Sequence, residues 1–287
     1  MASNMKAVKL RIRSVQSTMQ ITKAMELVAA SKIRKAKERA DVCRPYFKEL
    51  YQTLQDIANG NTDFSSKYVR VSDNEKTCVV VIAGDRGLAG GYNANLFRAL
   101  ENSIKGKSIV VLPVGKKAVE YCERRGYEIL TRTFGEIARL DVSSCFGMAN
   151  LICSEYGKGS FGHVDLCFTR FISMLSQQTD VLDLLPLSEL SKDQDPEHLK
   201  SIRDLILYEP GASEVFDAIV PEYLAGVLYG AVCESVASEL AARRTAMDSA
   251  TKNAEEMIDQ LNLFYNRARQ ASITQEITEI VAGAESV

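Results

Sequence analysis

The sequence has no tryptophan and only two histidines, and its seven cysteines are scattered along 287 residues. No C-x-x-C pair occurs, which argues against a zinc module and a disulfide framework, so we expect reduced thiols. No run of eighteen or more apolar residues is present, so no transmembrane helix is expected. The N-terminus lacks the apolar segment of a secretory signal. With 46% apolar and 25% charged residues, the composition is typical of a soluble protein.

Catalytic signatures are missing as well. Neither histidine lies near a serine or cysteine in a recognisable motif, and the patterns H-E-x-x-H and G-x-S-x-G do not occur. Nothing in the sequence calls for an enzyme.

The two ends of the chain carry opposite charge. Residues 1–50 contain twelve Lys and Arg against four Asp and Glu, whereas residues 211–287 contain five against twelve. Such polarity often marks a nucleic-acid-binding arm or an acidic tail. Both stretches have a strong apolar period, however, so no nucleic-acid partner is expected.

Residues 1–60 are predicted to form one long helix. Its apolar residues recur at alternating steps of four and three, which is the seam of a left-handed coiled coil. Pro45 tends to kink a helix, but the period continues on both sides of it, and Asn59-Gly60-Asn61 ends the helix. The seam consists of Val8, Ile12, Val15, Met19, Thr22, Glu26, Ala29, Ile33, Ala36, Ala40, Cys43, Phe47, Leu50, Leu54 and Ile57.

Residues 211–287 are predicted to form a second long helix, which begins after Pro210 with Ser213 as its cap. Only Pro221 interrupts it, close to its start. Arg243 is the one charged residue in its seam. The predicted seam consists of Tyr229, Cys233, Val236, Leu240, Arg243, Met247, Ala250, Ala254, Met257, Leu261, Phe264, Ala268 and Ala271.

The two helices are expected to pair with each other as an antiparallel coiled coil, because a compact middle domain joins them and their charges are opposite. The alternative, in which each helix pairs with another protein, stays open. At about 1.5 Å per residue the helices span roughly 85 Å and roughly 110 Å, so the second projects beyond the first. From Ala271 onward the projecting tip keeps an apolar stripe that a partner must cover, made of Ile273, Ile277, Ile280 and Val281.

Residues 75–209 are predicted to form a central α/β (Rossmann-like) domain with a mostly parallel sheet. Strands are expected at 77–84, 108–115 and 128–133, and helices at 93–104, 116–125 and 140–156. Residues 164–173 and 178–187 are interpreted as an antiparallel pair of strands, 188–200 as a loop, and 204–208 as a final short strand. The predicted fold class is therefore α/β, combined with a long two-helix coiled coil.

The glycine-rich turn Gly84–Gly91 joins the first expected strand to a helix, which is a place where phosphate groups often bind. It lacks both G-x-G-x-x-G and the G-K-[ST] ending of a P-loop. A tight turn with close packing is therefore favoured over nucleotide binding.

Four segments resemble the gamma subunit of F-type ATP synthase, in the family's order and spanning nearly the whole chain. They are ITKAMELVAASK at 21–32, DRGLAGGYN at 85–93, YEP at 208–210 and NRARQASITQEITEIV at 266–281. The resemblance implies a non-catalytic rotor shaft without a cofactor or metal. It implies that the helical tip enters the ring of three alpha and three beta subunits. The central domain then meets the epsilon subunit and the c-subunit ring, whose proton-driven rotation turns the shaft.

The resemblance also implies roles for eight residues. Positions that meet the beta subunit are matched by Lys23, Met25, Arg243, Arg269, Gln270 and Thr274, and positions that meet the c ring by Tyr208 and Glu209. From the residues alone, Lys23 and Arg269 are better interpreted as solvated charges and Met25 as packing within the coiled coil, whereas the resemblance favours interface roles.

The resemblance has two departures. The loop at 188–200 is short and has no cysteine, unlike the regulatory insertion of the chloroplast type, and no transit peptide precedes the first helix. We therefore expect a peripheral protein on the cytoplasmic side of a bacterial inner membrane, with the matrix side of the mitochondrial inner membrane as the alternative. Two other hypotheses remain: a non-rotating coiled-coil scaffold, and an α/β enzyme whose 84–91 turn binds a ligand.

Overall fold

A computed structural model of the chain describes residues 1–287 except 1, 61–63, 71, 189–207 and 286–287. The expected loop at 188–200 and the expected strand at 204–208 fall almost wholly outside the described residues. The chain divides into two compact units, one formed by residues 1–31 and 243–287 and the other by residues 32–242. Both long helices, α1 (Ala2–Gly60) and α6 (Ala212–Glu285), contribute to both units. The division into 1–60, 75–209 and 211–287 stays a prediction.

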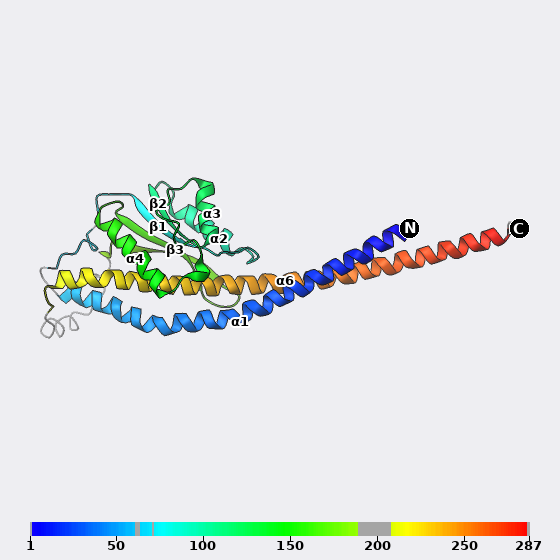
Figure 1. Cartoon of the computed structure of the whole chain (residues 1–287), viewed down its shortest axis with the longest axis horizontal. Coiled ribbons are helices and arrows are strands. Elements are labelled where there is room, and N and C mark those ends of the chain that lie inside the picture. Colours follow the sequence, from blue (N-terminus) through cyan, green and yellow to red (C-terminus); the bar gives the residue numbers. More distant parts are fainter. Residues whose placement is uncertain (1, 61–63, 71, 189–207, 286–287) are drawn as a thin grey trace. The chain divides into compact units, whose positions relative to one another are not determined.

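In the first unit the two helices run antiparallel, side by side, as predicted (Figure 1). The α1 seam is confirmed in this unit, because its predicted positions are the ones that become buried or half-buried. These positions are Val8, Ile12, Val15, Met19, Thr22, Glu26 and Ala29.

The predicted α6 seam is confirmed only in part beyond Met247. Ala250, Ala254, Leu261 and Ala268 are buried or half-buried as predicted, whereas Met257, Phe264 and Ala271 are exposed. Polar Thr251 and Ser272 are buried instead. At four places the contact position lies one residue beyond the predicted one, namely at Thr251, Ile258, Tyr265 and Ser272.

The second unit contains a four-stranded sheet in the order β2-β1-β3-β4. The central strand β1 (Thr77–Ile82) pairs in parallel with β2 (Ile109–Val114) and with β3 (His163–Phe171). The last strand, β4 (Gln177–Leu185), pairs antiparallel with β3, which confirms the expected hairpin.

The predicted strand at 128–133 is wrong. Only an isolated parallel bridge joins Ile129 to Val111. Beyond it the Thr131 hydroxyl accepts a hydrogen bond from the Thr133 amide at 3.2 Å, and this local turn diverts the backbone from the sheet edge.

Helices cover both faces of the sheet. The helices α2 (Tyr92–Ser103) and α3 (Lys116–Arg125) pack on the face that presents Val79 and Val81. The other face packs against α4 (Val142–Gly157) and against parts of α1 and α6 that belong to the same unit. A short 3-10 helix, η1 (Ile137–Arg139), precedes α4. The expected α/β architecture is thereby confirmed.

One segment of α6 qualifies the expectation that no helix is apolar enough to cross a membrane. Within Ala212–Ala282 an eighteen-residue window has a mean hydropathy of 1.4, and 44% of that window is buried inside the protein. By length and composition alone, this helix is long and apolar enough to cross a membrane. Core helices of soluble proteins have the same property, and here Phe216, Leu224 and Leu228 belong to the larger core.

Candidate partner-binding surfaces

The eight residues expected at subunit interfaces do not form one site. Lys23 and Met25 lie on α1, and Arg269 lies near the C-terminal end of α6 with its neighbours Gln270 and Thr274. Along α6, Arg243 and Arg269 are about 39 Å apart at 1.5 Å per residue.

Lys23 lies among charged residues of both helices. Its Nζ atom is 2.9 Å from Oε2 of Glu26, and the Lys23 side chain is 55% exposed. The hydrogen bond to Glu26 raises the pKa of Lys23, and the charges of Asp248 and Glu255 on α6 act in the same direction. This charge is paired within the coiled coil but stays accessible to a partner.

Beside Lys23, a pair of threonines crosses the coiled-coil seam. The hydroxyls of Thr22 and Thr251 are 2.8 Å apart, and both residues are buried. Each hydroxyl also lies close to a carbonyl of its own helix, that of Met19 or Met247. The sequence interpretation includes Thr22 but not Thr251, because its alternating steps lead from Met247 to Ala250, whereas the structure takes a second step of four residues there.

The coiled-coil unit leaves many large apolar side chains in contact with solvent. Met25 itself is half-buried, whereas Arg269, Gln270 and Thr274 are exposed. Exposure of this many large apolar side chains indicates a surface that a partner covers. The exposed apolar residues are Leu10, Ile21, Leu27 and Val28 on α1, and Met257, Leu263, Phe264, Ile273, Ile277, Ile280 and Val281 on α6.

Arg243 is half-buried and already engaged by neighbouring groups. In the other unit, Tyr208 is half-buried against the larger core, and Glu209 is exposed. Burial raises the pKa of Tyr208, and the charge of Asp56 adds to the shift. The Tyr208 ring is thus anchored while Glu209 faces solvent.

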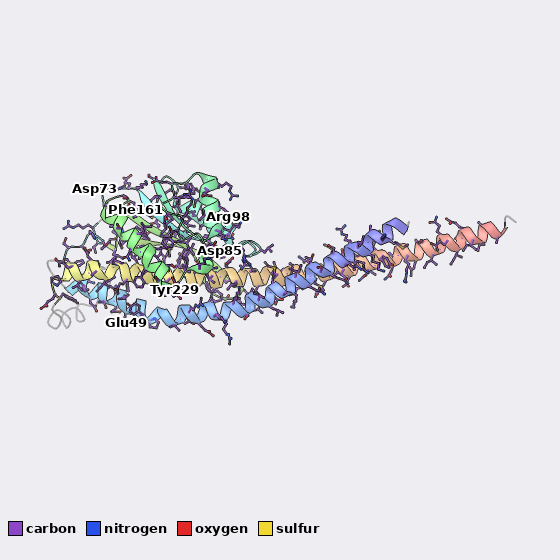
Figure 2. All side chains as sticks on the ribbon, in the orientation of Figure 1. Glu49, Asp73, Asp85, Arg98, Phe161 and Tyr229 are labelled. Carbon is purple, nitrogen blue, oxygen red and sulfur yellow. The ribbon has the colours of Figure 1, made fainter. Side chains whose placement is uncertain are left out.

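The glycine-rich turn at 84–91 is tied to the protein by its own polar groups. Asp85 accepts hydrogen bonds from the backbone amides of Lys116, Ile137 and Ala138, each at 3.0 Å. The Gly84 amide donates to Oδ1 of Asn93 at 3.1 Å. Asp85, labelled in Figure 2, therefore uses its carboxylate within the protein, so a structural role for the turn is favoured.

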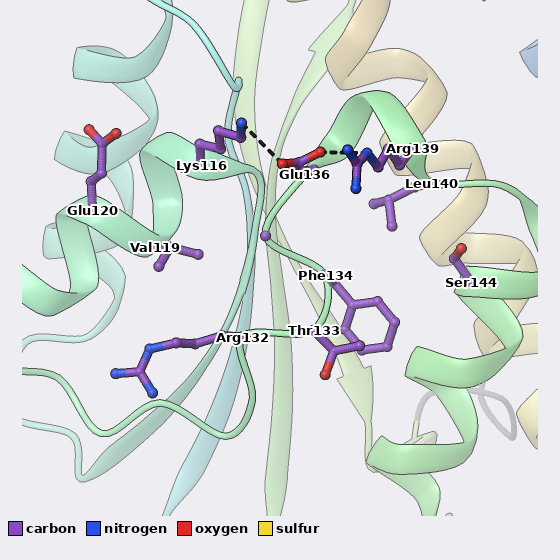
Figure 3. A pocket seen from close by; sticks show the side chains of 11 residues that line it. Lys116, Val119, Glu120, Arg132, Thr133, Phe134, Glu136, Arg139, Leu140 and Ser144 are labelled. Carbon is purple, nitrogen blue, oxygen red and sulfur yellow. Dashed lines mark ion pairs between the residues drawn. The ribbon is translucent and has the colours of Figure 1, made fainter.

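A cavity of about 570 Å³ lies between the start of α3 and the start of α4 (Figure 3). Glu136 forms ion pairs with Lys116 at 3.1 Å and with Arg139 at 2.7 Å. Arg132 pairs with Glu123 at 2.9 Å. The cations around this cavity already have carboxylate partners, which disfavours an anionic ligand.

A second cavity, of about 680 Å³, is lined by His163, Asp165 and Asp183 among others. Asp165 is paired with Lys107 at 3.2 Å. Among the residues that the structure describes, no group of three or more His, Cys, Asp or Glu side chains could hold a metal ion.

Comparison with known proteins identifies the family. A family model described as ATP synthase matches residues 4–287. The ATP synthase gamma chain of Ruminococcus albus is 46% identical over 284 residues, which cover 97% of this chain and 96% of that one. The chain belongs to the ATP synthase gamma-chain family. The sodium-ion-specific gamma chain of Acetobacterium woodii is 38% identical, with 100% of both chains covered.

Solved structures agree with this at the level of the fold. A chain of Euglena gracilis mitochondrial ATP synthase has a TM-score of 0.70 at 16% identity, covering 100% of this gamma chain and 95% of that chain. A chain of the Tetrahymena thermophila ATP synthase central stalk has a TM-score of 0.60 at 22% identity, covering 80% and 99%.

Proposed function

We propose that this gamma chain is the central rotor shaft of an ATP synthase. It is a non-catalytic subunit that couples ion flow through the c-subunit ring to ATP synthesis and hydrolysis in the hexamer of alpha and beta subunits. The observation that carries this conclusion is the match to gamma chains over the full length of the sequence. The coiled coil with its exposed apolar tip supports it, because a shaft needs surfaces that a surrounding ring can cover.

The eight residues receive roles within this function. Lys23, Met25, Arg243, Arg269, Gln270 and Thr274 contact beta subunits, and Tyr208 and Glu209 contact the c ring. The exposure of Lys23, Arg269, Gln270, Thr274 and Glu209 supports these roles. The epsilon subunit binds the central α/β domain.

The complex is associated with a membrane. We place this chain on the cytoplasmic side of a bacterial inner membrane, because the bacterial relatives named above are 38% to 46% identical over the full length. Protons are the proposed coupling ion. Sodium is the alternative, since the Acetobacterium woodii relative is sodium-ion-specific.

The stoichiometry of the native complex tests the proposal. The tagged chain is purified from membranes of its source, and the intact complex is weighed by native mass spectrometry. A rotor shaft predicts one copy per hexamer of alpha and beta subunits. A non-rotating scaffold or an α/β enzyme predicts recovery without the hexamer, and that result would contradict the proposal.

A further inference from the structure

The position at which open α/β sheets usually bind a ligand is occupied here by the long helix α6. In such sheets, ligands bind beyond the carboxyl ends of two neighbouring strands whose connections leave in opposite directions. In this sheet β1 is followed by β2 on one side, and β3 lies on its other side. Gly84 follows the end of β1, and Thr169 lies near the end of β3. Residues 235–239 of α6 fill the space between them.

Two serines of α6 bind the backbone of β3. The Ser235 hydroxyl accepts a hydrogen bond from the Thr169 amide at 3.4 Å, and the Ser238 hydroxyl donates to the Thr169 carbonyl at 3.2 Å. Both serines are 0% exposed. Water therefore does not compete for these bonds, which fasten one residue of the sheet to two successive positions on one face of the helix.

Glu239 completes the contact by approaching the glycine-rich turn. Glu239 is 7% exposed, and a Cβ atom added at Gly84 would lie 2.6 Å from its Oε1 atom. Any side chain at position 84 would therefore displace the Glu239 carboxylate from its present place. The buried hydroxyl of Tyr92, at the start of α2, lies close enough to the same carboxylate to be affected by its charge. Burial raises the pKa of Tyr92, the charge of Glu239 raises it further, and the Ser235 and Thr169 hydroxyls oppose the shift.

We propose that these residues form a joint through which the central domain grips α6 and passes torque to it. The α6 joint consists of Gly84, Tyr92, Thr169, Ser235, Ser238 and Glu239. Apolar contacts between a sheet and a helix are non-directional and resist sliding weakly, whereas hydrogen bonds weaken steeply when their angle changes. The joint therefore opposes rotation of α6 about its own axis. It holds the helix in the place where related architectures hold a ligand.

This inference rests on the rotor function and names the positioning residues for it. Torque from the c ring enters the shaft through the central domain and must pass to α6 before it reaches the beta subunits. Rotation of the detached catalytic part of the complex carries no such load. A weakened joint is thus expected to impair the complex only when torque passes between the c ring and the beta subunits.

The test compares Ser235→Ala/Ser238→Ala with the parent in the assembled complex. Alanine favours a helix, so the substitutions remove two hydrogen bonds without weakening α6 itself. We expect ATP hydrolysis by the detached catalytic part to stay within about twofold of the parent. Ion pumping per ATP against an opposing gradient should fall about tenfold, the fold-change that corresponds to about 1.4 kcal/mol.

The matched control is Ser143→Ala/Ser154→Ala, which changes two exposed serines of α4. It should leave hydrolysis and pumping unchanged. Normal pumping by the assembled Ser235→Ala/Ser238→Ala complex overturns the joint. If that double variant fails to assemble, the single variants decide by the same criterion, with a smaller loss of pumping expected. A parent complex that hydrolyses ATP without pumping contradicts the rotor function itself, which is a separate outcome.

Discussion

At the scale of single residues, apolar periodicity predicts which side chains face inward but not how buried polar groups find partners. Asp85 was recognised within a family-like segment, yet its three backbone contacts depend on η1 and α3, which follow it by many residues. Thr251 and Glu239 were missed for the same reason. Their burial depends on partners that are far away in the sequence.

Replacing Met25 tests the proposed contact with the beta subunit. Met25 is half-buried on α1, next to the Lys23–Glu26 pair. A lysine there adds a cation that can pair with an acidic beta-subunit segment, by about 1–3 kcal/mol at partial burial. Since about 1.4 kcal/mol slows a step tenfold, Met25→Lys should lower ion pumping per ATP in vesicles while assembly persists. Met25→Leu should behave like the parent. Unchanged pumping by Met25→Lys would count against a role for this position.

Replacing Asp85 tests the structural role of the glycine-rich turn. Asp85→Ala leaves three amides without their acceptor, so the free energy of unfolding should fall by about 2–3 kcal/mol. Asp85→Asn keeps one oxygen acceptor and should cost about 1 kcal/mol. Urea unfolding of the purified chain, followed by circular dichroism, measures both values. Asp73→Ala is the control, because Asp73 is exposed on the same domain. Equal stability of Asp85→Ala and Asp73→Ala would refute the structural role.

At the scale of elements, the two long helices and the four main strands could be predicted because long periodic patterns and buried runs are strong signals. The strand predicted at 128–133 does not form, because a local hydrogen bond between Thr131 and Thr133 competes with sheet pairing. Part of the predicted α6 seam is wrong because the partner helix, and not local hydropathy, decides which face turns inward. Thr251 is buried there while Phe264 is exposed.

The projecting tip of α6 is expected to act as a bearing. All described residues from Ile273 to Ala282 are exposed, and they include the four members of the apolar stripe. Covering such side chains in a surrounding ring contributes several kcal/mol at roughly 25 cal/mol per Å². Deleting residues 278–287 should therefore lower the thermal stability of the complex more than its torque. A longer deletion that also removes Arg269 should lower both the thermal stability of the complex and its torque.

Single-molecule torque and thermal dissociation of the complex, measured on the two truncations, check the bearing. The full-length chain in the same complex is the reference. Loss of rotation with full stability in the shorter truncation would rule the bearing out.

At the scale of the whole molecule, membership of the gamma-chain family explains why the Rossmann-like domain has no P-loop lysine that would bind phosphate. Its helix starts and glycine-rich turn bind groups of the same chain. We therefore expect the isolated chain to bind no ATP at micromolar concentrations. Isothermal titration calorimetry measures this directly. Saturable binding that disappears on changing Gly87 or Gly90 would contradict it.

Rotation of the chain inside the complex tests the central claim most directly. The hexamer is fixed to a glass surface through its beta subunits, and a bead is attached to the central domain at Asp73→Cys. Six of the chain's cysteines are buried, so the new thiol is a more reactive target than these six, namely Cys78, Cys122, Cys145, Cys153, Cys167 and Cys233. A rotor shaft predicts that ATP drives continuous rotation of the bead in one direction. A bead that stays still while the complex hydrolyses ATP would contradict the account.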